Sequence, residues 1–294
     1  MKKKTISLVL GSGGARGLAH IGIIRWLEEH DCEIKSITGC SMGALVGGIH
    51  AIGMLDEYEK WARHITKRHM LALMDLSFGM DGLIKGDRLI DTLRNLVGDE
   101  LIENLPISFT AVAANISRRK EVWIRQGSLF DAIKASIALP LIFKPVVVDG
   151  DDIIDGGILN PVPIAPTFGD LNEYTIAVNL CAPPVKGIEI KNDKHNGDEN
   201  GSGLSHVVAE FIGTMTDKIA MKRKDIRAYD ILYKSFDAMQ GSIARQKIAA
   251  YPPDAVLDIP INLCSLMDFD KADPLIEHGY RLAEKKLPDV FASR

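Results

Sequence analysis

The chain of 294 residues lacks the marks of several functional classes. Its four cysteines, at positions 32, 40, 181 and 264, form no C-x-x-C pair and suit neither zinc binding nor a disulfide framework. Aromatic residues make up only 6%, which argues against a surface that stacks nucleic-acid bases. The formal net charge of -4 gives no general attraction to nucleic acid. We therefore expect reduced thiols, no metal, no cofactor and no nucleic-acid partner.

Long apolar runs are also missing. No window of about 20 apolar residues occurs, so we expect no membrane-spanning helix. The apolar run Ile6–Leu10 is shorter than the ~7–15 residues of a secretory signal, and no A-x-A cleavage pattern follows it. The preceding Lys2–Lys4, at about 1 kcal/mol each, form at most a weak anchor to anionic lipid. These features predict a cytoplasmic protein and leave open a transient contact with the inner face of the membrane; they do not predict an oligomeric state.

Short apolar runs that alternate with amphipathic segments predict an α/β fold. The strand–turn–helix order at the start implies a parallel sheet with right-handed crossovers. We expect strands at Thr5–Leu10, Ile34–Thr38, Ile107–Asn115, Glu121–Arg125, Tyr174–Leu180 and Ala255–Ile259, with a hairpin at Val146–Ile154. We expect helices at Ala15–Glu29, Ser41–Ile52, Leu55–Arg68, Gly86–Val97, Ser128–Ile137 and Lys271–Lys286, and a mostly helical region at 204–250.

One serine has the setting of a nucleophile. The stretch ITGCSMGAL contains G-x-S-x-G, in which Ser41 follows a β-branched strand and opens a helix, with Gly39 and Gly43 leaving room for a tight turn. The helix N-terminus beside Ser41 favours developing negative charge. The alternative is a serine that only caps a helix packed through glycines.

A second glycine cluster, GSGGARG at residues 11–17, also lies between a strand and a helix. Consecutive small residues can direct several backbone N–H groups into one space, as an oxyanion hole requires. A dinucleotide-binding turn is the competing interpretation, but the third glycine of G-x-G-x-x-G falls on Arg16. We therefore favour the oxyanion hole.

No histidine is an obvious base for Ser41. Of the eight histidines, five fall on helical segments near the serine, and the three downstream lie in a polar loop or on helices: His20, His30, His50, His64 and His69, then His195, His206 and His278. A carboxylate is the other choice. Asp155 follows an apolar strand and precedes Gly156 and Gly157, on a turn that could approach Ser41, although DGG taken alone is better explained by an aspartate that only forms a turn.

Taken together, GSGGARG, GCSMG and DGG, in this order, resemble the patatin-like phospholipase family. AIKASIALPLIFKPV (Ala132–Val146) and DGGILNPVP (Asp155–Pro163) are similar to two further segments of the family. The resemblance covers about Thr5–Leu180, and the C-terminal end is similar to bacterial members on the branch of the neuropathy-target-esterase (NTE) domain. It implies a three-layer fold with a mainly parallel central sheet flanked by helices.

The resemblance also implies roles for residues. Ser41 would be the nucleophile and Asp155 the base of a Ser–Asp dyad, with Gly13, Gly14 and Ala15 forming the oxyanion hole. The supporting motif residues would be Gly11, Ser12, Arg16, Gly17, Gly39, Gly43, Gly156 and Gly157. Ser12 stands where many members have glycine, and Asn115 stands where relatives often have aspartate.

The expected function is hydrolysis of fatty acyl esters of lipids through an acyl-enzyme. A thioesterase, a lysophospholipase or a short-chain esterase could use the same dyad, and a regulatory protein with a residual site is a further alternative. We expect a catalytic domain at 1–181, a polar loop at 182–203 and a helical extension at 204–294 that packs on the same domain. The Met-rich segment His69–Met80 could be an apolar lid or acyl channel, or ordinary core.

Overall fold

One central sheet organises the molecule. The computed structural model describes every residue except 1–2, 74–84, 141, 189, 191–222 and 294. The described residues form an eight-stranded sheet in the order β5-β6-β3-β2-β1-β7-β8, with β4 paired to β3 outside this path. The strands are β1 (Lys4–Leu10), β2 (Cys32–Cys40), β3 (Ser108–Asn115), β4 (Lys120–Ile124), β5 (Val146–Val148), β6 (Asp151–Asp155), β7 (Tyr174–Ala182) and β8 (Ala255–Pro260).

The sheet is parallel in its centre and antiparallel at one side. Strands β3, β2, β1, β7 and β8 pair parallel, whereas β4 and β6 run antiparallel to β3 and β5 runs antiparallel to β6. Antiparallel pairing places the end of β6 beside β3, close to the carboxyl ends of the parallel strands. The expected α/β class with a mainly parallel sheet is confirmed. The region after residue 204 contributes β8 to this sheet as well as helices.

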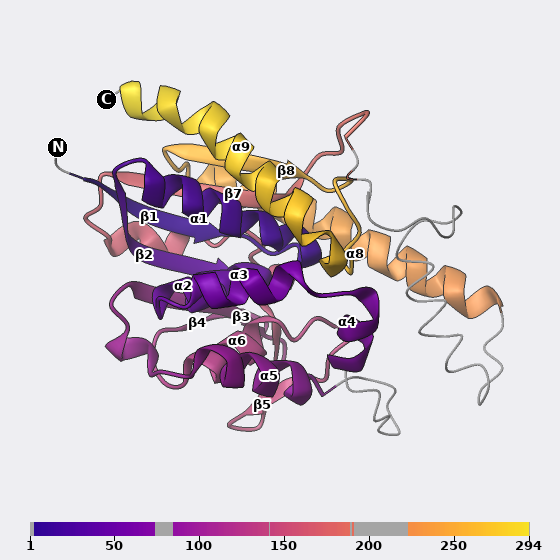
Figure 1. The fold of residues 1–294 in the computed structure, drawn as a ribbon. Coiled ribbons are helices and arrows are strands. Elements are labelled where there is room, and N and C mark those ends of the chain that lie inside the picture. Colours follow the sequence, from indigo (N-terminus) through magenta and orange to yellow (C-terminus); the bar gives the residue numbers. More distant parts are fainter. Residues whose placement is uncertain (1–2, 74–84, 141, 189, 191–222, 294) are drawn as a thin grey trace.

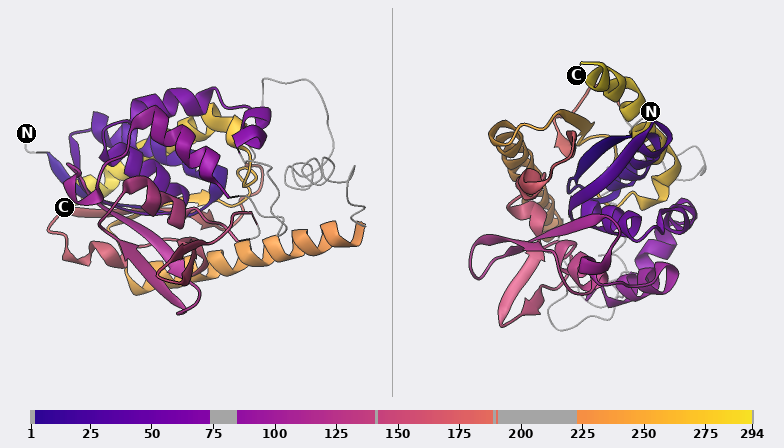
Figure 2. Two further views of the ribbon diagram at one scale, coloured as in Figure 1. Left: turned by 90° about the horizontal axis from the view of Figure 1, so that it is seen from below. Right: turned by 90° about the vertical axis from the view of Figure 1, so that its left-hand side faces the viewer.

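Helices cover both faces of the sheet (Figure 1). They are α1 (Ala19–Glu29), α2 (Met42–Ala51), α3 (Leu55–Arg63), α4 (Lys67–Leu73), α5 (Asp87–Val97), α6 (Leu129–Ser136), α8 (Arg223–Ala250) and α9 (Ala272–Ala292). Figure 2 shows α8, in orange, on the opposite side of the sheet from the indigo and purple helices. Three layers result, as expected.

Strand alternation explains how the layers form. Leu8 and Leu10 of β1 point into the larger core with α1, α2 and α9, whereas Val9 points the other way. Val9 packs with Ala177 of β7 and Ala244 of α8 in a second core. Because β1 is buried on both faces, it has apolar residues in succession at 8–10 instead of an apolar–polar alternation, as is typical of strands inside a parallel sheet.

The expected elements match the structure closely, with two helices divided. The segment expected as Ala15–Glu29 is a 3-10 helix at Gly14–Leu18 followed by α1. The segment expected as Leu55–Arg68 forms α3 and α4, because Thr66 accepts a hydrogen bond from the His69 N–H at 3.2 Å and so starts a new helix. Residues 191–203 of the expected loop, 204–222 and the later part of the Met-rich segment lie outside the described residues. Within the described part of the chain, no helix has the length and apolar character needed to cross a bilayer.

Candidate active site

Ser41 lies on a sharp turn between β2 and α2. Its φ of 54° and ψ of -120° are unusual for a residue with a side chain. Such strain costs about 1–3 kcal/mol and persists only where the surrounding structure enforces it. The Ser41 N–H donates to Ser136 Oγ at 2.9 Å, and Ser136 Oγ donates to the Val112 carbonyl at 2.7 Å. Ser41 is therefore held through its backbone, while its side chain lines a pocket.

The two glycines around Ser41 permit a close approach of backbones. A Cβ atom on Gly43 would lie 2.0 Å from the Leu10 carbonyl oxygen, and one on Gly39 would lie 2.4 Å from the Gly43 carbonyl oxygen. Neither contact involves a flexible side chain that could move away. The G-x-S-x-G pattern therefore allows α2 to start directly against the end of β1.

The glycine cluster that follows β1 lies beside Ser41. The amides of Gly11 and Ser12 donate to backbone carbonyls outside the loop. Gly13 and Gly14 line the same pocket as Ser41, and their N–H groups have no acceptor within the described residues. Gly13 is buried and Gly14 is half-buried, and donors without a partner are unusual away from solvent in a folded protein. They are available for an acceptor that enters the pocket.

Ala15 differs from the two glycines before it. Its N–H donates to the Leu266 carbonyl at 2.7 Å, and Ala15 is not among the residues that line the pocket. The amide that the resemblance offered as a third oxyanion donor is thus engaged with the loop that precedes α9. Gly14, with a φ of 57°, provides the backbone turn that directs the chain from the pocket toward this bond.

Arg16 supports the glycine cluster from behind. Its side chain is 2% exposed, and its Nε donates to the Gly13 carbonyl at 3.1 Å. Its Nη1 donates to the Ile261 carbonyl at 2.7 Å, and its Nη2 lies 3.9 Å from Asp237 Oδ1 of α8. Because the Arg16 Nε–H donates to the Gly13 carbonyl, the guanidinium fixes the orientation of the peptide between Gly13 and Gly14. Arg16 therefore holds the glycine cluster in place.

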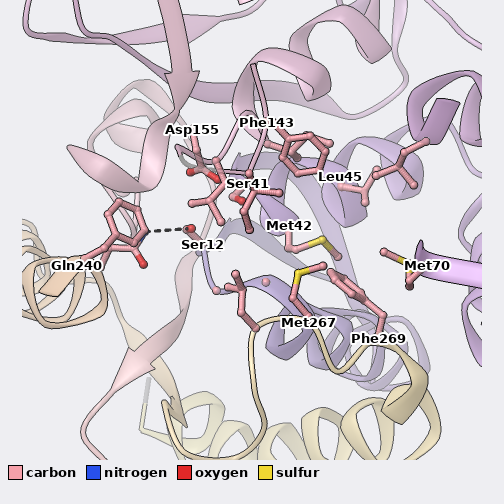
Figure 3. Close-up of a pocket in the computed structure, with 18 of the residues that line it drawn as sticks. Ser12, Ser41, Met42, Leu45, Met70, Phe143, Asp155, Gln240, Met267 and Phe269 are labelled. Carbon is pink, nitrogen blue, oxygen red and sulfur yellow. Dashed lines mark hydrogen bonds between the residues drawn. The ribbon is translucent and has the colours of Figure 1, made fainter. Parts of the chain in front are cut away.

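Asp155 comes to the pocket from the end of β6. Its N–H donates to the Ala138 carbonyl at 3.0 Å, and its Oδ1 accepts the Gly157 N–H at 2.7 Å. The Cys40 thiol lies 3.9 Å from the same oxygen. The second carboxylate oxygen, Oδ2, has no partner of ordinary hydrogen-bond geometry in the described part of the chain. Figure 3 shows Asp155 and Ser41 next to each other at one side of the pocket.

The surroundings of Asp155 make its carboxylate unusually basic. Burial raises its pKa from 3.8 to about 6, whereas the Ser41 hydroxyl, the Gly157 N–H and the Cys40 thiol lower it. Desolvation is the larger effect because Asp155 is 1% exposed and no cation is among the causes of the shift. An acid with a pKa near 6 is ionised at neutral pH and accepts a proton more readily than an exposed aspartate.

The histidines of the described residues lie outside this pocket. The fully buried His20 donates from Nε2 to the Gly11 carbonyl at 3.0 Å, and burial lowers its pKa to about 4 despite that bond. Burial, together with the charge of Arg25, also lowers the pKa of His50 to about 4. Both rings are neutral at physiological pH and have structural contacts. Among the residues that the structure describes, no group of His, Cys, Asp and Glu is suited to hold a metal ion.

The pocket itself is mostly apolar. It contains about 800 Å³ of empty space, its open mouth included. Its walls come from α2, α3, α4, α5, the segment after α6, α8 and the loop before α9. The apolar lining residues are Met42, Leu45, Trp61, Met70, Leu89, Leu93, Ile137, Leu139, Ile142, Phe143, Phe236, Leu266, Met267 and Phe269.

The polar lining residues gather at one side. Figure 3 shows Ser12, Ser41, Asp155 and Gln240 together, with Met70 on the far side of the pocket. This arrangement suits a ligand with a reactive polar end and a long apolar part. Ser136 and Gln240 were not predicted as site residues. Ser136 lies within Ala132–Val146, one of the segments that resemble the family, whereas no local pattern marks Gln240 on α8.

Comparisons with known proteins agree with this geometry. A family model described as patatin-like phospholipase matches residues 8–168. An uncharacterized NTE family protein of Mycobacterium tuberculosis is 33% identical over an alignment of 342 residues. The alignment covers 96% of this chain and 91% of that protein. A lysophospholipase of Emericella nidulans is 30% identical over 167 residues, which span 55% of this chain and 11% of that protein.

A solved structure shares the fold. The crystal structure of VipD from Legionella pneumophila matches with a TM-score of 0.50 and 13% identity, covering 98% of this chain and 67% of that chain. At this identity the similarity concerns the fold alone. The family model and the full-length mycobacterial relative carry the classification. The chain belongs to the patatin-like phospholipase family, on its NTE branch, and is a lipid ester hydrolase.

Proposed function

We propose that this protein hydrolyses fatty acyl esters of lipids through a Ser41–Asp155 dyad and an acyl-enzyme. The observation that carries the proposal is the meeting of a strained serine and a buried carboxylate of raised pKa at the polar side of an apolar pocket. A strained backbone and a shifted pKa at the same place are typical of catalytic centres.

In the first step, Ser41 Oγ attacks the ester carbonyl and its proton passes to Asp155 Oδ2. The Ser41–Asp155 contact does not have ordinary hydrogen-bond geometry without a ligand. Contacts of this kind are often long in ligand-free enzymes and shorten when substrate binds. The alcohol then leaves with the proton from Asp155, and the acyl group remains on Ser41.

The negative charge that develops on the carbonyl oxygen needs donors. The N–H groups of Gly13 and Gly14 supply them in this proposal, since both line the pocket and lack acceptors among the described residues. Each such donor lowers the barrier by about 3–4 kcal/mol in enzymes where one was removed. We leave Ala15 out of the oxyanion hole, because its N–H is bonded to the Leu266 carbonyl.

The substrate class follows from the pocket and the relatives. A wall of leucine, isoleucine, phenylalanine and methionine side chains favours a fatty acyl chain over a short acid. The relative named as a lysophospholipase suggests a single-chain phospholipid as the first substrate to assay. A thioester of a fatty acid would also fit the dyad, so thioesterase activity is the second candidate.

The direct test is labelling of the nucleophile. A fluorophosphonate probe should label the wild type and not Ser41→Ala, because only an activated serine reacts. Turnover of lysophospholipids, acylglycerols and acyl thioesters should disappear in Ser41→Ala and Asp155→Asn. Full activity of Asp155→Asn would rule out the dyad, and activity restricted to thioesters would move the assignment to a thioesterase.

Contact with lipid layers belongs to the same proposal. A fatty acyl ester is drawn from a membrane or micelle, so we expect brief peripheral binding at a lipid surface. Co-flotation with phospholipid vesicles measures this directly, and catalytically inactive Ser41→Ala keeps the vesicles intact during the measurement. Absence of any co-flotation would favour a substrate that is delivered in solution.

A further inference from the structure

Two polar side chains in the pocket have no part in the acylation step. Ser12 and Gln240 are each 3% exposed, and both line the pocket with Ser41 and Asp155. The Gln240 Nε2 donates to Ser12 Oγ at 3.4 Å, as Figure 3 shows. Gln240 comes from α8 and Ser12 from the glycine cluster, so the contact joins elements from opposite ends of the chain.

The orientation of the Gln240 amide follows from its neighbours. The Cys181 thiol donates to the Ser12 carbonyl oxygen at 3.4 Å, and its sulfur lies 4.0 Å from Gln240 Oε1. With Oε1 facing a thiol, Nε2 faces Ser12 Oγ as a donor. Ser12 thus accepts one hydrogen bond, and its own hydroxyl proton is left to donate to a further acceptor.

The pair lies directly beside the base. A Cβ atom on Gly157 would lie 2.3 Å from Gln240 Nε2 and 2.6 Å from Ser12 Oγ, so both side chains pack against Gly157. The N–H of Gly157 bonds to Asp155 Oδ1, and Oδ2 has no partner of ordinary hydrogen-bond geometry among the described residues. Ser12 and Gln240 therefore pack against the glycine that bonds to the Asp155 carboxylate, and they line the same pocket as that carboxylate.

Hydrolysis of an acyl-enzyme needs a water molecule at this place. A buried water makes about three hydrogen bonds to polar groups, and most of this pocket offers none. Apart from Ser41 and Asp155, which react, the polar side chains among its lining residues are Ser12 and Gln240, with the Trp61 indole on α3. Of these, Ser12 and Gln240 pack against Gly157, whose N–H bonds to Asp155.

We propose that Ser12 and Gln240 hold the water that hydrolyses the acyl-enzyme. This inference rests on the proposed Ser41–Asp155 dyad and concerns its second step. The water oxygen forms a bond with the acyl carbon while Asp155 Oδ2 takes one water proton. The bond between the acyl carbon and Ser41 Oγ then breaks, the proton passes from Asp155 to Ser41, and the fatty acid leaves.

The arrangement separates two sets of donors. The Gly13 and Gly14 amides serve the carbonyl oxygen in both steps, whereas the Ser12 hydroxyl and the Gln240 amide serve the water in the second step only. Ser12→Ala and Gln240→Met should therefore slow deacylation by about tenfold each, as expected for one lost hydrogen bond, and change acylation less than threefold. Methionine keeps the length of glutamine without its amide.

The experiment measures both steps in the full-length protein with a p-nitrophenyl ester of a medium-chain fatty acid. Stopped-flow release of p-nitrophenol gives the burst for acylation and the steady state for deacylation, and intact-mass spectrometry gives the acylated fraction. Both variants should show a burst like the wild type, a slower steady state and a larger acylated fraction. Ser7→Ala is the matched control, since it removes another buried hydroxyl from β1 outside the pocket.

The outcomes separate the two proposals. Wild-type steady-state rates in both variants, with acyl-enzyme forming normally, would overturn the water-holding role and leave the dyad intact. A loss confined to the burst, and dependent on the leaving alcohol, would also overturn it and assign Ser12 and Gln240 to binding of that alcohol. No acyl-serine in any protein, the wild type included, would instead contradict the dyad itself.

Discussion

Two of the serine–aspartate clusters among the described residues differ in the properties that general-base catalysis uses. In one, Ser41 has a left-handed φ, and Asp155 has one carboxylate oxygen with no partner among the residues that the structure describes. In the other, Ser7 and Ser36 lie in the middle of β1 and β2 and both donate to one carboxylate oxygen of Asp170. The same residue types thus form the candidate active site in one place and a structural contact in the other.

The second cluster is completed by a further donor. Asn172 donates from Nδ2 to Ser7 Oγ at 2.8 Å, and Ser36 Oγ lies 3.1 Å from Ser7 Oγ. None of these residues lines the apolar pocket. In this network the hydroxyl groups and the Asp170 carboxylate oxygen are already bonded to one another. Under the proposed dyad, reactivity requires an acceptor that has no partner and a strained donor, and not merely the presence of serine and aspartate.

The largest expected effect comes from removing each carboxylate charge in turn. Asp155→Asn should lower kcat by about 10²–10⁴-fold, the usual contribution of a general base, because the amide cannot take the Ser41 proton. Asp170→Asn should leave kcat within twofold. Steady-state assays on one fatty acyl ester measure both. A similar loss in the two variants would mean that the clusters are not functionally distinct.

Asp155→Asn should also reveal how much the burial of the Asp155 carboxylate destabilises the folded state. A pKa raised from 3.8 to about 6 means that the folded state holds the proton more tightly than the unfolded state, so the stability of the wild type falls as pH rises between about 4 and 6. Asp155→Asn escapes this loss. It should be more stable than the wild type by up to roughly 3 kcal/mol above pH 6.

Denaturant unfolding of both proteins at pH 8 and pH 4 measures this difference. The advantage of Asp155→Asn should be complete at pH 8 and nearly absent at pH 4, where the wild-type carboxyl is protonated as well. Asp170→Ala is the matched control and should lose about 1–3 kcal/mol, because two buried hydroxyls lose their shared acceptor. If Asp155→Asn and the wild type were equally stable at pH 8, burial of the ionised Asp155 carboxylate would not destabilise the folded state.

A smaller effect on kcat and on stability is expected at the hydrogen bond that holds the Ser41 turn. Ser136→Ala leaves the buried N–H of Ser41 without its acceptor and should cost about 1–2 kcal/mol of stability. Because Ser41 then turns more freely, kcat should fall while KM changes little. Ser36→Ala, which also removes a buried strand-associated hydroxyl, should lower stability without changing kcat. If kcat fell by the same factor in Ser136→Ala and Ser36→Ala, the effect would come from a general loss of stability and not from the turn at Ser41.

The sequence predicted the parts of this site that depend on local backbone geometry. G-x-S-x-G, the glycine cluster and DGG are each short patterns that require small residues where chains approach closely, and the structure places all three around one pocket. Strand and helix positions followed from short apolar runs and apolar periodicity, since most residues of β1, β2 and β7 are buried. The roles of Ser41 and Asp155 stay predictions until they are tested.

Contacts between distant segments could not be predicted in this way. Gln240 reaches Ser12 only because α8 packs on the opposite face of β1 from α2, and the helix carries no local pattern that marks one glutamine. The Ala15 amide is engaged by Leu266 from a loop far along the chain, so its sequence position beside Gly14 was misleading. Tertiary hydrogen bonds of this kind decide which amides remain free.

The smallest expected effect concerns the apolar surroundings that only the Ser41 cluster has. Leu139 is half-buried on the pocket wall, so Leu139→Ala should remove apolar contact with an acyl chain while disturbing the core less than a fully buried leucine would. At about 0.8 kcal/mol per buried methylene, the loss in kcat/KM should be about tenfold for long chains. Acetyl esters, which are too short to reach the wall, should be hydrolysed at nearly the wild-type rate.

The ratio of long-chain to acetyl kcat/KM is therefore the informative quantity, because damage to the dyad lowers both values together and leaves the ratio unchanged. Leu171→Ala is the matched control, since Leu171 is exposed and lies next to Asp170 in the chain, away from the pocket lining. It should change neither value. If Leu139→Ala lowered both substrates equally, Leu139 would support the fold of the site rather than contact the acyl chain, and the apolar wall would no longer distinguish the two clusters.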